Sequence, residues 1–114
     1  MAKNENLHGT LELLVMKVLR GGPRHGFALA AAIRQMSDDV LRVEAGSLYP
    51  ALHRMTDEGL LEPKWQKTEA GRRARFYTLT PRGRKKLEAA EKKWHAVSAA
   101  VTLVFQDLFL IRLP

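Results

Sequence analysis

Cysteine is absent from the 114 residues, and only four histidines are present. Without thiols the chain can form neither a disulfide framework nor a zinc site built on thiolates, which agrees with a reducing compartment. The four histidines include no pair at the HxxxH spacing that places two metal ligands on one helix face. We therefore expect no metal site and no cofactor.

Two motifs that enzymes use to bind phosphate or to activate a nucleophile are missing as well. The segment GGPRHG, residues 21–26, lacks the lysine and the Ser/Thr of a P-loop, and it follows a predicted helix rather than a strand. Ser47 lies in EAGSLYP, which does not match the G-x-S-x-G turn of a hydrolase nucleophile. The sequence therefore indicates a protein that is not an enzyme.

No long hydrophobic run is present either. The most apolar segment, VTLVF at 101–105, is followed by Gln106 and Asp107 and is much shorter than the roughly 20 residues that span a membrane. The first ten residues carry no apolar signal-peptide core. We expect no membrane span and no secretory signal, and hence a cytoplasmic protein.

Acidic residues are rare in one part of the chain, and this leaves a concentrated positive charge. The net charge is +7. Between residues 64 and 86 the only acidic residue is Glu69, against nine lysines and arginines. A positive charge that is clustered in this way is typical of a nucleic-acid-binding surface.

Apolar residues recur at helical spacing in two segments before residue 40. The first helix is predicted from its N-cap, Thr10, to the stop at Gly21-Gly22-Pro23. The second covers residues 25–39 and closes at Asp38 and Asp39. The residues that we expect near its buried side are Phe27, Ala30, Ile33, Gln35 and Met36. Apolar and polar residues alternate briefly over residues 40–46, which predicts a minor strand.

A third helix is predicted within residues 43–59, ending at Gly59. Its apolar side is formed by Leu48, Leu52 and Met55. We place Pro50 in the first helical turn, where the missing N–H has no partner to lose.

The pattern changes to period two after the third helix. Residues 60–66 and 73–80 predict two strands joined by a turn at Gly71. Pro63 indicates that the first of these strands lies at a sheet edge. The predicted fold class is therefore mostly α-helical with a small β-hairpin. We expect a winged helix-turn-helix domain over residues 1–80.

The last segment, residues 81–114, predicts one long helix that begins at Thr80 and Pro81. Its apolar residues are spaced alternately by three and four, which is the pattern of a coiled-coil seam. We therefore expect a homodimer whose interface contains Leu87, Ala90, Trp94, Val97, Val101, Val104 and Leu108. Trp94 has two interpretations: a large core residue of the dimer, or the wall of a cavity that binds an aromatic ligand.

A helix that is held by one apolar side can present its other side to the DNA major groove. In the third helix that outer side contains Ser47, Tyr49, Pro50, His53 and Arg54. The alternative is an ordinary surface, with Tyr49 packed on the domain. Four basic residues of the hairpin are candidates for phosphate contacts: Lys67, Arg72, Arg73 and Arg75. The alternative for these is a solvated hairpin whose charges serve solubility.

Four segments in this order and spacing resemble the PadR family of transcriptional regulators. They are GTLELLVMKVL, HGFALAAAI, VEAGSLYPALHRMTDEGLLEPKW and GRRARFYTLTPRGRKKL, and the resemblance covers roughly residues 9–95. It implies a bacterial winged-helix homodimer that binds double-stranded DNA at a palindromic operator, usually as a repressor. Some members bind aromatic compounds near the dimer interface, which makes Trp94 a candidate ligand contact. Whether Tyr49 contacts a base or a phosphate stays open. A protein-interaction module that docks a partner through the apolar C-terminal helix is the alternative function.

Overall fold

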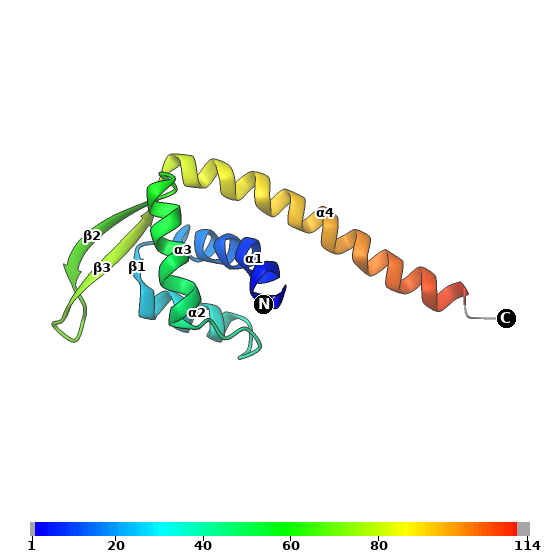
Figure 1. The fold of residues 1–114 in the computed structure, drawn as a ribbon, viewed down its shortest axis with the longest axis horizontal. Coiled ribbons are helices and arrows are strands. Elements are labelled where there is room, and N and C mark those ends of the chain that lie inside the picture. Colours follow the sequence, from blue (N-terminus) through cyan, green and yellow to red (C-terminus); the bar gives the residue numbers. More distant parts are fainter. Residues whose placement is uncertain (1, 112–114) are drawn as a thin grey trace.

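The structure of the chain is a computed structural model that describes residues 2–111, with side chains described for residues 9–107. Four helices and three short strands make up this part of the chain (Figure 1). In chain order they are α1 (Ala2–Leu19), β1 (Arg24–His25), α2 (Gly26–Met36), α3 (Ala45–Asp57), β2 (Leu61–Lys67), β3 (Arg73–Leu79) and α4 (Pro81–Ile111). The fold is a winged helix-turn-helix followed by a long C-terminal helix, as the sequence predicts.

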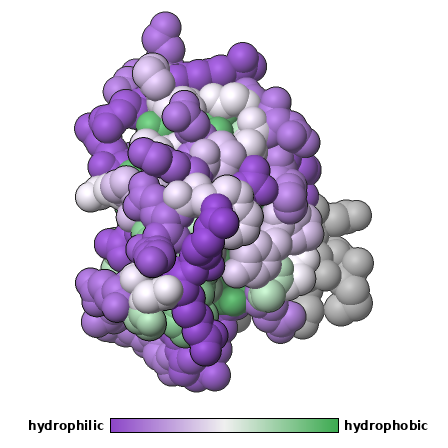
Figure 2. All heavy atoms as spheres, turned by 90° about the vertical axis from the view of Figure 1, so that its left-hand side faces the viewer, coloured by the Kyte–Doolittle hydropathy of each residue, from purple (hydrophilic) through white to green (hydrophobic). Residues whose placement is uncertain are grey.

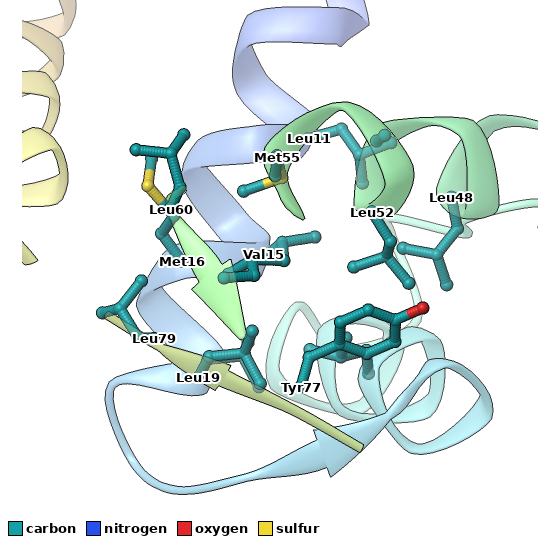
Figure 3. Packing of buried hydrophobic residues seen from close by; sticks show 14 of the residues in the cluster. Leu11, Val15, Met16, Leu19, Leu48, Leu52, Met55, Leu60, Tyr77 and Leu79 are labelled. Carbon is teal, nitrogen blue, oxygen red and sulfur yellow. The ribbon is translucent and has the colours of Figure 1, made fainter. Parts of the chain in front are cut away.

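The core lies where α1, α3 and the base of the hairpin meet (Figure 3). Val15 of α1 is fully buried, as are Leu52 and Met55 of α3. Leu61 and Leu79 close the core from the two hairpin strands. The predicted apolar side of the third helix is confirmed, because Leu48, Leu52 and Met55 each have at most 1% of their surface exposed.

The three strands form one antiparallel sheet in the order β1-β3-β2. Pro63 lies in β2, an outer strand of this sheet, as predicted. Gly71 has a φ of 84° in the turn, a left-handed conformation that glycine adopts without strain. The partners of Tyr77 and Arg75 across the hairpin are Pro63 and Trp65, and these four residues lie on the same sheet face.

Three local predictions are wrong. Thr10 is not an N-cap, because α1 begins at Ala2 and already includes it. The side chains of Phe27 and Met36 are exposed, by 78% and 70%, and that of Gln35 is exposed as well, because α2 buries a different stripe, with Leu29 and Ile33 at its centre.

Residues 40–44 form no strand. The chain turns instead after α2, with Asp38 and Asp39 both at positive φ. The extra strand is β1, where Arg24 pairs with Tyr77 and His25 pairs with Phe76.

The first turns of α4 are fixed to the domain, and the rest of the helix projects from it (Figure 1). The Thr80 hydroxyl accepts a hydrogen bond from the Gly83 amide at 3.0 Å, so the predicted cap is confirmed. Lys17 of α1 forms an ion pair with Glu91 of α4 at 3.0 Å. The radius of gyration is 16.9 Å, compared with about 13 Å for a compact domain of this length. Within the described residues no helix is long and apolar enough to cross a membrane.

Candidate nucleic-acid interface

The outer side of α3 is open to solvent along its first two turns. Ser47, Pro50 and His53 are exposed there, opposite the buried Leu48 and Leu52. Pro50 lies one turn further into the helix than predicted, because α3 already begins at Ala45. A proline at this position cannot donate to the carbonyl four residues earlier, so that carbonyl keeps free acceptor capacity near the start of α3.

Arg54 and Tyr49 differ from these three residues. The guanidinium of Arg54 lies 3.4 Å from a carboxylate oxygen of Glu12, so this side chain is turned toward α1. Tyr49 is 44% exposed and packs over Gly26 at the start of α2. A Cβ at residue 26 would lie only 2.7 Å from the Tyr49 ring, so this packing requires glycine. The structure therefore brings Ser47, Pro50 and His53 together on one open surface.

The start of α2 is held against the sheet by His25. Its Nδ1 accepts a hydrogen bond from the Ala28 amide at 3.2 Å, which caps the helix. Its ring also meets the Phe76 ring edge-on, with the ring centres 5.1 Å apart. The strand β1 and this cap therefore position α2, and with it Gly26 and Tyr49, beside the hairpin.

The hairpin formed by β2 and β3, with the turn between them, is the wing of the fold. Its guanidinium groups lie over aromatic rings: that of Arg73 is 5.3 Å from the centre of the Trp65 ring, and that of Arg75 is 5.7 Å from the centre of the Tyr77 ring. Lys67 is the cross-strand partner of Arg73, and Arg72 lies at the turn. Among the described residues, none of these four cations forms an ion pair with a carboxylate. The wing thus presents uncompensated positive charge.

An open groove of about 1220 Å³ lies between the wing and the first turns of α2 and α3. Its lining includes Arg24, Phe27 and Tyr49, together with Trp65 and Arg75 of the wing. The face of the molecule that carries the wing is mainly hydrophilic (Figure 2). In the part of the chain with described side chains, no cluster of residues could hold a metal ion.

Three residues of this surface, Arg24, Trp65 and Tyr77, are not among those predicted from the sequence. Arg24 is in β1, which is too short to show a period-two pattern. The signal for Trp65 and Tyr77 was present, since both share a sheet face with Arg75 once the hairpin register is known. Burial of Tyr77 raises the pKa of its hydroxyl, and the nearby positive charge of Arg75 opposes this shift.

The predicted seam of α4 divides into two parts. Leu87 is 1% exposed and already belongs to the core of the single chain, and Ala90 is partly buried. Beyond them Trp94, Val97, Val101 and Val104 are 45–55% exposed. The side chain of Leu108 lies outside the described range. These four residues form a row of half-exposed apolar side chains on the projecting part of α4.

Comparison with known proteins agrees with this geometry. The sequence model of the transcriptional regulator PadR-like family matches residues 15–89. The chain belongs to this PadR-like family of transcriptional regulators. The PadR family transcriptional regulator from Eggerthella lenta is 31% identical and superposes with a TM-score of 0.71, covering 89% of this chain and 86% of that one.

Two further relatives add to this result. The PadR-like transcriptional regulator from Bacillus cereus is 27% identical, with a TM-score of 0.77 over 90% of this chain and 97% of that one. An uncharacterised 37.1 kDa protein of a Streptomyces fradiae transposon is 38% identical over 96 residues. These cover 84% of this chain but 25% of the transposon protein. Membership places this PadR-like chain among transcription regulators, which are not enzymes.

Proposed function

We propose that this PadR-like regulator binds double-stranded DNA with the outer side of α3 in the major groove and the wing on the adjacent backbone. The observation that carries the proposal is the unpaired positive charge of the wing, which lies beside the open surface of α3. Ser47, Pro50 and His53 are the residues free to face base edges. Lys67, Arg72, Arg73 and Arg75 neutralise phosphates. Arg54, paired with Glu12, stays at the margin of this surface.

We further propose that the protein acts as a homodimer in the cytoplasm. The apolar row of α4 from Ala90 to Val104 supports this proposal, because it is too exposed for a helix that stays alone in water. Two copies related by a two-fold axis would present two copies of α3 to a palindromic operator. Binding at such a site favours repression by occlusion of the promoter.

An aromatic effector is the third part of the proposal. Trp94 is 46% exposed on the same row, so in the dimer its indole lies at the interface between subunits. A planar ligand that stacks on this indole would alter the interface, and with it the distance between the two copies of α3.

The DNA-binding proposal is tested by fluorescence anisotropy with a labelled random duplex at several salt concentrations. Arg73→Ala is expected to weaken binding and to reduce the salt slope by about 0.9, because one phosphate contact is lost. Lys92→Ala on α4 is the matched control, since it removes the same charge outside the proposed DNA-binding surface. The salt slope of this variant is expected to equal that of the wild type. An equal slope change in both variants would contradict a role for the wing.

A second candidate function is docking of a partner protein on α4. Its support is Leu103 and Phe105, which are 57% and 69% exposed and lie outside the apolar row. A purified chain that shows no DNA binding at low salt, while Phe105→Ser abolishes a complex with an identified protein, would favour this function over the first.

A further inference from the structure

We propose that the groove between the wing and α2 holds one backbone phosphate of the DNA, bound by the hydroxyls of Tyr49 and Tyr77 and the guanidinium of Arg75. This inference rests on the proposed DNA-binding function and assigns a site within it. It also assigns Tyr49 to the backbone rather than to a base.

Tyr77 provides the first hydroxyl of the proposed site. It is 4% exposed, yet it forms part of the groove wall. Its ring packs beside Leu48 and Leu52, with the hydroxyl at the end that points away from Leu19 (Figure 3). Among the described residues this hydroxyl forms no hydrogen bond, and no fully enclosed side-chain oxygen or nitrogen lacks a partner, so the hydroxyl itself is open to the groove. Tyr77 therefore offers a donor to whatever occupies the groove.

Arg75 provides the charge. Its guanidinium lies over the Tyr77 ring, and Arg24 is the neighbour of Tyr77 on the other side, in β1. Neither arginine has a carboxylate partner in the part of the chain with described side chains. An anion bound at the Tyr77 hydroxyl would thus be flanked by positive charge on the same sheet face.

Tyr49 provides the second hydroxyl. Its oxygen would lie 2.8 Å from a Cβ on residue 26, so the hydroxyl lies against the start of α2. Tyr49 of α3 and Tyr77 of β3 line the same groove. Two neutral donors and one cation suit a tetrahedral anion with a single negative charge, and a phosphodiester has this chemistry.

The other residues that line the groove suit a DNA strand better than a free phosphate ion. The groove is open, and its most exposed rings are those of Phe27 and Trp65, at 78% and 59%. Rings at the two rims can pack against the deoxyriboses on either side of the bound phosphate. A free phosphate ion would leave both rings in water.

The test is a scan of a bound duplex in which one phosphate at a time is replaced by a neutral methylphosphonate. For the wild-type chain, replacement at the contacted position is expected to weaken binding about tenfold. Tyr77→Phe is expected to weaken binding of the unmodified duplex by a similar factor and to lose sensitivity at that one position. Its thermal midpoint should not fall, because the hydroxyl has no partner within the chain. If the hydroxyl has a structural role instead, Tyr77→Phe will have a lower thermal midpoint and the same methylphosphonate scan as the wild type. This result would overturn the inference.

A second variant isolates Tyr49. Gly26→Ala is expected to displace the Tyr49 ring and to weaken binding as much as Tyr49→Phe does, with no further loss when the two changes are combined. If the wild type binds DNA but no position loses its sensitivity in Tyr77→Phe, the inference fails and the DNA-binding function stands. If the wild type binds no duplex, the function itself fails. Chemical-shift changes at Tyr77 that saturate with millimolar inorganic phosphate alone would assign the site to a free anion and overturn the inference.

Discussion

Replacing Val101 in the exposed row of α4 should weaken the dimer by an amount that follows from the exposure of this side chain. Val101 is 45% exposed in the single chain, so about half of its surface remains to be buried by a partner. Full burial of a valine contributes about 1.5–3 kcal/mol. Each subunit contributes half of that energy, so the two valines together stabilise the dimer by about 1.5–3 kcal/mol. Val101→Asp removes this term and adds the cost of placing two carboxylates in an apolar interface, which is several kcal/mol.

The dimer dissociation constant should therefore rise by at least two orders of magnitude, because each 1.4 kcal/mol is a factor of ten. Sedimentation equilibrium measures this constant directly. Ala99→Asp is the matched control, since it introduces the same charge on the same helix two residues away and outside the apolar row. Equal dissociation constants for the wild type and Val101→Asp, or an equal loss in both variants, would refute the assignment of this row to the dimer interface.

Three further predictions concern stability and ligand binding. Gly83→Ala should lower the free energy of unfolding, measured by calorimetry, by about 1–3 kcal/mol, because a Cβ there would lie 2.6 Å from Leu79 and closer still to the Leu60 carbonyl. Gly9→Ala is the control: a Cβ at residue 9 meets no atom, so this variant should not be destabilised. Lys17 holds the pKa of Glu91 below its usual value of 4.5, so the ion pair stabilises the fold fully above that pH and less as pH falls through the lowered pKa. The difference in thermal midpoint between the wild type and Lys17→Ala should then shrink as the pH falls from 7 to below 4.5, and a constant difference would exclude this ion pair as the cause. In Trp65→Phe, where Trp94 is the remaining tryptophan, aromatic effectors should quench fluorescence in a saturable manner, and no response across a ligand panel would leave Trp94 as a structural residue.

Much of the fold could be predicted because its signals are local. Spacing of apolar residues predicts the helices, and it places Leu48, Leu52 and Met55 in the core correctly. Pro63 and Gly71 mark the edge strand and the turn for reasons that involve only their own backbone. The cap of α4 follows from Thr80 and Pro81 in the same way.

The features that were missed depend on tertiary contacts. The apolar residues of α2 form two possible stripes at helical spacing. Only the positions of α3 and the sheet decide that the stripe with Leu29, rather than the one with Phe27, is buried. The two-residue strand β1 exists because it pairs with β3, so no pattern in its own sequence marks it. The groove combines residues of β1, α2, α3 and the wing, and its tyrosine pair is visible only when these elements are assembled.

Binding of a specific DNA site by the wing and α3 together is measured most directly by hydroxyl-radical footprinting. The purified chain is footprinted on the tightest duplex selected from a random-sequence pool. We predict two protected half-sites related by dyad symmetry, with centres about one helical turn apart or a multiple of that distance. A selection that yields no duplex bound more tightly than the random pool at physiological salt would contradict the claim.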